Sequence, residues 1–155
     1  MTEALDGLNE SGVSSPPPSG PPGRARLVAT CVPGDEPPWE SWHDPRLAAI
    51  SAVRWRLLVS AERTATAGMS AGLAEIAPDG VLPLHFHEPP ELYHVIAGEG
   101  LADVEGITHV LRAGVSLFIP GNARHRTTNT GRDPLRFLFV FPTDRFEDVT
   151  YRFEE

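Results

Sequence analysis

The chain has 155 residues, a formal net charge of -8 and 41% hydrophobic residues. This length and composition predict one globular domain with its own core and argue against a second full domain. The acidic balance argues against a nucleic-acid partner, which requires a clustered basic surface, and favours a small-molecule substrate. All 13 basic residues are arginines, which excludes Schiff-base chemistry and a P-loop because both need a lysine amine.

We expect no membrane-spanning segment and no N-terminal signal peptide in this sequence. There is no run of about 18 apolar residues, and the N-terminus MTEALDGLNE has acidic residues where a signal peptide needs a basic start. The single cysteine, Cys31, has no partner for an internal disulfide or a cysteine zinc site. We therefore expect a cytoplasmic protein with no membrane partner.

Residues 1–36 are rich in proline, glycine and serine, as in SSPPPSGPPG at 14–23. Such a segment buries too little apolar surface to offset its ordering entropy, so we expect a flexible, disordered tail. Within the tail, RARLVATCV at 24–32 has strand character and can pair along a sheet edge. The domain itself is predicted over 37–155, beginning with a short helical or irregular lead-in at 38–50.

From residue 51 onward, short apolar runs alternate with turn residues, which predicts an all-β domain. Strands are expected near 52–59, 65–77, 81–87, 92–97, 101–104, 107–111, 115–119, 124–129 and 135–141. Many short antiparallel strands without a long amphipathic helix suit a sandwich or barrel, and a jelly roll is one such solution.

The stretch HFHEPPELYHVIAGEG at 85–100 holds candidate metal ligands. Because strand side chains alternate between faces, His85 and His87 point the same way and can hold one ion. After the Pro89-Pro90 bend, Glu91 and Tyr93 share a face by the same parity. A second stretch, GVSLFIPGNARHRTTN at 114–129, predicts a strand, a turn and another strand that presents a further histidine.

Together the two stretches resemble the two motifs of the cupin superfamily. The first motif is matched by Gly80, His85, His87, Glu91 and Gly98, with the first spacer one residue short, and the second by Gly114, Pro120, His125 and Asn129. Asn122 stands where the second motif has glycine. Asparagine tolerates the left-handed backbone conformation, so the turn should be retained.

The resemblance implies a single cupin, jelly-roll-like β-barrel that holds one divalent metal ion. Its ligands would be His85, His87, Glu91 and His125. Fe(II) is the first expectation, while Mn(II), Ni(II), Zn(II) and Cu(II) suit the same donors. Barrels of this family often pair through an edge strand, which implies a homodimer.

Four functions are open for such a site. The first is a lyase that resembles the small cupin dimethylsulfoniopropionate lyases, with Tyr93 removing the proton in a β-elimination. The second is an Fe(II)-dependent dioxygenase, the third a metal-dependent isomerase or cyclase, and the fourth a cupin that binds a small ligand without chemistry. We rank them in this order, because Tyr93 offers a group able to move a proton close to the metal.

Several other residues carry weaker signals. GMSAG at 68–72 matches a nucleophile elbow around Ser70, but no helix can follow, so a strand is expected. Trp39 and Trp42 are expected to cover the barrel mouth, and Trp55 to line the barrel. The alternating residues Phe137, Phe139 and Phe141 are predicted to be core, and the C-terminal TDRFEDVTYRFEE to lie over the outside of the barrel.

Overall fold

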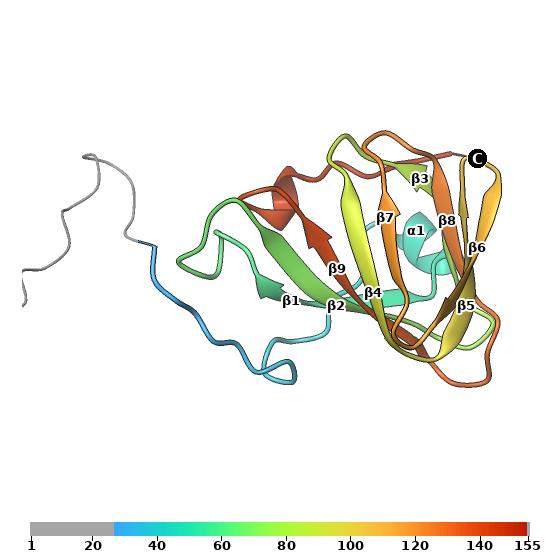
Figure 1. Cartoon of the computed structure of the whole chain (residues 1–155), viewed down its shortest axis with the longest axis horizontal. Coiled ribbons are helices and arrows are strands. Elements are labelled where there is room, and N and C mark those ends of the chain that lie inside the picture. The colour runs from blue at the N-terminus through green and yellow to red at the C-terminus, as the bar shows by residue number, and fades with distance from the viewer. Residues whose placement is uncertain (1–26, 155) are drawn as a thin grey trace, which may run out of the picture.

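The computed structural model describes residues 27–154, so the first 26 residues of the predicted tail lie outside the described part. Two five-stranded antiparallel sheets face each other and form the body of the molecule (Figure 1). This arrangement confirms the predicted all-β, jelly-roll-like fold.

The two sheets interleave strands that are distant in the sequence. The first has the order β1 (Val53–Val59), β2 (Ser70–Ile76), β9 (Leu135–Phe141), β4 (Glu91–Ala97), β7 (Ser116–Ile119). The second has the order β10 (Arg152–Phe153), β3 (Val81–Phe86), β8 (His125–Asn129), β5 (Glu99–Val104), β6 (Ile107–Arg112). The remaining elements are a six-residue helix, α1 (Pro45–Ile50), and a 3-10 turn, η1 (Phe146–Asp148).

The core lies between the sheets and follows the period of two that the sequence shows. On β4, Glu91, Tyr93 and Val95 are buried while the residues between them are exposed. On β9, Leu135, Phe137, Phe139 and Phe141 are buried, which confirms the predicted core positions. The inner faces therefore carry the large apolar side chains, as expected for two packed sheets.

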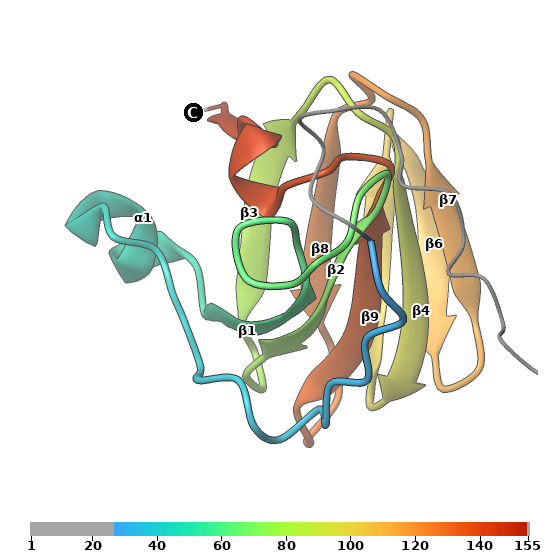
Figure 2. The same ribbon diagram turned by 90° about the vertical axis from the view of Figure 1, so that its left-hand side faces the viewer.

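The predicted lead-in is confirmed as the short helix α1, which lies outside the two sheets (Figure 2). Asp44 caps the helix by accepting from the Arg46 backbone N–H at 2.9 Å, and Pro45 occupies its first turn. Within residues 27–154, no helix is long and apolar enough to cross a membrane.

Two of the expected strands differ from the prediction. The strand expected at 65–77 begins only at Ser70, because Gly68 has a left-handed φ of 77° and the preceding residues form turns. In those turns, the Ser60 N–H donates to the Thr64 hydroxyl at 3.0 Å. This side-chain bond satisfies a backbone N–H that would otherwise pair with a neighbouring strand. The edge strand expected at 24–32 is also absent from its described part: residues 27–33 form no ladder, although the Val28 N–H donates to Ala65 O at 3.3 Å.

The motif asparagine, Asn129, forms three side-chain hydrogen bonds at the end of β8. Its side-chain amide donates to the carbonyls of Ile76 and Asp133, each at 2.9 Å. Its side-chain oxygen accepts from the Gly131 N–H at 2.9 Å. These bonds satisfy the buried amide and fix the turn between β8 and β9.

A buried carboxylate joins three strands on the outer face of the first sheet. Glu75 lies directly between Arg54 on β1 and Arg136 on β9 in the strand register. Its carboxylate accepts from Arg54 Nε at 2.9 Å and from Arg136 Nε at 2.6 Å. Burial alone would raise the pKa of Glu75, but the bonds from Arg136 and Arg54 outweigh it and hold the pKa below its usual value.

We expect Glu75→Gln to reduce the free energy of unfolding by about 1–3 kcal/mol at pH 7, because a neutral amide loses the charge-assisted bonds that the carboxylate accepts from Arg54 and Arg136. A carboxylate with a lowered folded-state pKa stabilises the protein above its unfolded-state pKa. That contribution disappears as the pH falls through the folded-state pKa.

Denaturant titrations at pH 7 and in stepwise more acidic buffers would measure the difference between wild type and variant. The difference should shrink as the pH falls below about 4.5, the range where a free glutamate is protonated. Glu99→Gln, at an exposed position on β5, is the matched control and should leave stability unchanged. A constant difference across the pH range would show that the charge of Glu75 is not its cause.

Candidate metal centre

Three histidines from two paired strands meet inside the barrel. His85 is on β3, His87 directly follows β3, and His125 begins β8 opposite His85. All three are buried, with at most 1% of each exposed. One ring nitrogen from each lies within 4.8 Å of the others, so the three residues can hold a single ion.

Backbone carbonyls fix the orientation of all three imidazoles. The Nδ1 atoms of His85, His87 and His125 lie 2.7, 2.9 and 2.8 Å from the carbonyl oxygens of residues 83, 89 and 123. A proton on Nδ1 donates to each carbonyl and leaves the Nε2 lone pair free, as in histidines that bind metals. The Nε2 atoms of His85 and His125 are buried without a hydrogen-bond partner among the described residues. Buried nitrogen lone pairs without a hydrogen-bond partner are suited to bind a metal ion.

Glu91 adds a carboxylate to the histidine cluster. Its Oε2 atom lies 3.2 Å from His87 Nε2 and 3.5 Å from His125 Nε2, and only 2% of its side chain is exposed. The ligand atoms that all lie within 4.8 Å of one another come from the three histidines, and Glu91 is not part of that group. Glu91 therefore lies at the edge of the cluster, next to His87 and His125. The structure thus brings Glu91 close to the three histidines, and its role as a fourth ligand stays a prediction.

The pKa values reflect this buried arrangement. Burial, with a further contribution from the charge of His125, lowers the pKa of His85 to about 3, so its imidazole is neutral at physiological pH. Burial also opposes the charged forms of His87 and Glu91. The hydrogen bond to Glu91 outweighs burial and raises the pKa of His87, while the proximity of His125 and then of His87 outweighs burial and lowers the pKa of Glu91.

A tight turn before β8 connects the two halves of the site. The Asn122 N–H donates to His87 O at 2.8 Å, so this turn is tied to the loop that carries His87. Asn122 has a φ of 62°, the left-handed conformation predicted for it, and the turn is retained. Gly121 packs its backbone so closely on Glu88 that an added Cβ would meet the Glu88 carbonyl oxygen.

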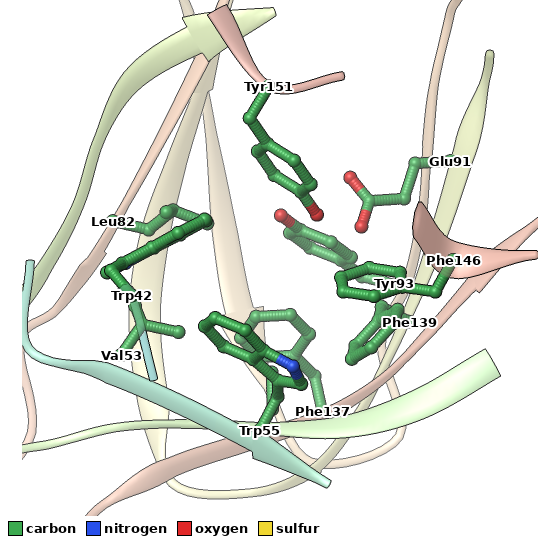
Figure 3. Close-up of a pocket in the computed structure, with 11 residues that line it drawn as sticks. Trp42, Val53, Trp55, Leu82, Glu91, Tyr93, Phe137, Phe139, Phe146 and Tyr151 are labelled. Carbon is green, nitrogen blue, oxygen red and sulfur yellow. The ribbon is translucent and has the colours of Figure 1, made fainter. Parts of the chain in front are cut away.

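A small aromatic cavity adjoins Glu91 at the centre of the barrel. It encloses about 20 Å³ and is lined by Trp42, Val53, Trp55, Ala74, Leu82, Glu91, Tyr93, Phe137, Phe139, Phe146 and Tyr151. The hydroxyls of Tyr93 and Tyr151 and the carboxylate of Glu91 point toward one another (Figure 3). Burial and the negative charge of Glu91 raise the pKa of Tyr93 well above its usual value. The cavity thus has one polar corner and otherwise apolar walls.

Tyr151 is a cavity residue that the sequence did not reveal. The C-terminal segment was expected to lie over the outside of the barrel, and this prediction is wrong for its aromatic side chains. Residues 152–153 pair with β3 as β10, and the Tyr151 ring stacks on His85 with centroids 5.2 Å apart. No motif marks Tyr151, and β10 is only two residues long, so the sequence carried no periodic signal for this contact.

The other candidate residues are divided between the cavity and the exterior. Trp55 lines the cavity, as predicted, and Trp42, which was expected to cover the barrel mouth, lines it too. Trp39 does not: it packs on the outer face of β1, where the guanidinium groups of Arg54 and Arg56 lie 4.2 and 4.5 Å from its ring. Cation–π attraction to these two arginines stabilises it there. Ser70 begins β2 and its hydroxyl bonds to that of Thr143 at 2.8 Å, in a strand and not in an elbow.

Residues 72–141 match the family model described as "Cupin domain". This match, the two facing sheets and the buried histidine cluster agree with one another over this part of the chain. The resemblance seen in the two motifs is thereby confirmed.

Relatives with different activities share this domain. The chain is 43% identical over 101 residues to dimethylsulfoniopropionate lyase DddW of Ruegeria pomeroyi. The match covers 65% of this chain and 66% of the lyase, so this chain spans just under two thirds of the length of that relative. The polyketide cyclase RemF from Streptomyces resistomycificus has the same fold, with a TM-score of 0.69, 22% identity and coverage of 83% of this chain and 87% of that one. An oxalate oxidase in complex with glycolate matches with a TM-score of 0.59 and 25% identity over 66% of this chain and 55% of that one.

We expect the purified protein to bind about one divalent ion per chain. The His125→Ala variant should lose most of this metal binding, because it lacks one of the three converging histidine nitrogens. An ion at a free concentration 100 times its Kd should stabilise the wild type by about 2.7 kcal/mol. Metal content by mass spectrometry and thermal unfolding with and without a chelator would measure both effects.

His94→Ala is the matched control, since His94 lies on β4 but faces outward and contacts the Ser116 hydroxyl at 2.9 Å. The control should bind metal as the wild type does. Equal metal content in wild type and His125→Ala would contradict the assignment of this site.

Proposed function

We propose that the protein is a metal-dependent lyase that acts on a small carboxylate-bearing molecule, by a β-elimination like that of dimethylsulfoniopropionate lyases. One observation carries the proposal: a buried tyrosine hydroxyl, that of Tyr93, faces the cavity beside Glu91 and the histidine cluster. The 43% identity to a lyase of this name supports the choice of reaction.

In this proposal His85, His87, Glu91 and His125 hold one divalent ion, with Fe(II) as the first metal to test. The ion would supply positive charge that binds a substrate carboxylate, acidifies the adjacent carbon and stabilises a nearby phenolate. The backbone carbonyls that bond to Nδ1 keep the imidazoles oriented toward this position.

Tyr93 is the proposed general base. Its oxygen takes a proton from the carbon next to the carboxylate, and the electron pair of that C–H bond forms a carbon–carbon double bond. The bond between the next carbon and the sulfur breaks, and its electrons leave with sulfur. Dimethylsulfoniopropionate would give dimethyl sulfide, acrylate and one proton, which Tyr93 passes on to solvent.

The walls of the cavity suit the other end of such a substrate. Trp42, Trp55 and Phe137 present aromatic faces toward the space next to Tyr93 (Figure 3). Aromatic faces attract organic cations, with a gain of about 2 kcal/mol where the cation is desolvated. A sulfonium group would therefore be bound without a carboxylate partner of its own.

Oxygen-dependent chemistry is the second candidate, because the oxalate oxidase shares the domain at 25% identity. A dioxygenase would bind dioxygen beside a chelating substrate, whereas the lyase consumes no gas. An isomerase or cyclase, and a cupin that binds without chemistry, are further alternatives. Each would leave dimethylsulfoniopropionate uncleaved. A homodimer stays a prediction from the family.

The test is release of dimethyl sulfide into the headspace by protein loaded separately with Fe(II), Mn(II), Ni(II) or Zn(II), without oxygen. We expect the wild type to release it and Tyr93→Phe to be slower by about 100-fold or more, the usual contribution of a general base. Tyr151→Phe makes the same change at the second cavity tyrosine and should be slowed much less.

Equal rates for wild type and Tyr93→Phe would remove Tyr93 as the base. No release with any of the four metals would reject this substrate. In that case, oxygen uptake with chelating carboxylates would separate the dioxygenase from the remaining alternatives.

A further inference from the structure

A layer of four aromatic side chains separates the inner cavity from a second, open pocket. Trp42, Trp55, Phe146 and Tyr151 line both spaces. They form a closed circuit of contacts, with ring centroids 4.9 Å apart for Trp42 and Trp55, 6.1 Å for Trp55 and Phe146, 6.3 Å for Phe146 and Tyr151, and 5.3 Å for Tyr151 and Trp42. We call these four side chains the aromatic partition.

The two spaces differ greatly in size. The inner cavity, about 20 Å³, has room for about one water molecule. The outer pocket, about 430 Å³, falls in the range of sites for small ligands. An organic substrate therefore fits the outer pocket but cannot reach Tyr93 unless part of the cavity wall moves.

The partition is the part of this wall that moves most easily. Val53, Ala74 and Phe137 sit on paired strands of the first sheet, so displacing them breaks ladder hydrogen bonds. Three of the four partition residues come from outside the first sheet: Trp42 from the lead-in, Phe146 from η1 and Tyr151 from the segment before β10. Only Trp55 lies in a strand, where it pairs with residues 74 and 40.

Of the three, Phe146 is held most weakly. The indole N–H of Trp42 donates to the Ser51 hydroxyl at 2.9 Å, and the ring of Tyr151 stacks on His85. The Phe146 ring has no polar atom and is held by packing alone, with Phe139 at 5.3 Å among its neighbours, while its backbone N–H donates to the Ser60 hydroxyl at 2.8 Å. Its side chain can rotate without breaking a hydrogen bond and without disturbing a proposed metal ligand.

We infer that the outer pocket is the entrance to the site and that Phe146 is its gate, the residue that determines how large a substrate may pass. The inference rests on the metal site of the proposed function and not on the elimination itself. Gates of this kind limit binding rates, because a ligand must wait for the open conformation.

The test measures access to the metal site without turnover. Protein loaded with Co(II) is mixed with acetohydroxamate or with the bulkier benzohydroxamate, and the change in visible absorbance gives the association rate constant of each chelator. In Phe146→Ala we expect the rate constant for benzohydroxamate to rise about tenfold and that for acetohydroxamate to rise by less than about threefold. Phe146→Leu should raise the rate constant for benzohydroxamate in the same direction but by less. Because leucine keeps most of the side-chain volume, this variant tests the gate even if the alanine variant does not fold.

Phe118→Ala is the matched control. Phe118 is an exposed phenylalanine on β7 and lies outside the lining of both pockets. It should leave the ratio of the two rate constants at the wild-type value. A ratio that is the same in the wild type and both Phe146 variants would overturn the gate.

The outcome is independent of the proposed reaction. A shifted ratio in a protein that releases no dimethyl sulfide would reject the lyase and support the gate. Dimethyl sulfide release with an unchanged ratio would support the lyase and overturn the gate.

Discussion

The antiparallel pairing of β3 with β8 is the constraint on which the site depends. His85 and His125 are direct partners in this register, which brings their ring centroids to 4.1 Å. A slip of one residue would turn His125 to the outer face and break up the cluster. The bonds of Asn122 to His87 and of Asn129 to the next turn anchor β8 at both ends, and so prevent that slip.

Burial sets the electrostatic character of this cluster. Removing the Glu91 carboxylate from water is costly unless a positive group or several hydrogen-bond donors stand nearby. In the polypeptide alone His87 is the nearest such group, with its Nε2 3.2 Å from the carboxylate. A divalent cation would compensate Glu91 more fully and would also satisfy the free nitrogens of His85 and His125. Burial makes the Glu91 carboxylate costly in the polypeptide alone, and for the same reason it favours the binding of a cation beside the carboxylate.

Sequence reasoning succeeded where the signal was local. The period of two, the turn residues and the spacing of His85, His87 and Glu91 predicted the strands and the shared face of Glu91 and Tyr93. It failed where contacts join distant segments. Phe146 and Tyr151 reach the cavity from a C-terminal segment with one 3-10 turn and a two-residue strand, too short to show a period. Their positions follow from packing against Trp42 and His85, which no local pattern encodes.

The histidines and Glu91 cannot by themselves determine the reaction, because a lyase, a cyclase and an oxidase share this fold. The difference must lie in the groups around the open side of the cluster. Among the described residues that line the cavity, one is acidic, two are phenols and none carries a positive charge. A substrate carboxylate would therefore be held only by an ion at the histidines, and a cationic end only by the aromatic walls. Once the cavity wall has moved to admit it, a zwitterion would be oriented by both ends, with the carbon between them near Tyr93, which is the arrangement that the proposed elimination requires.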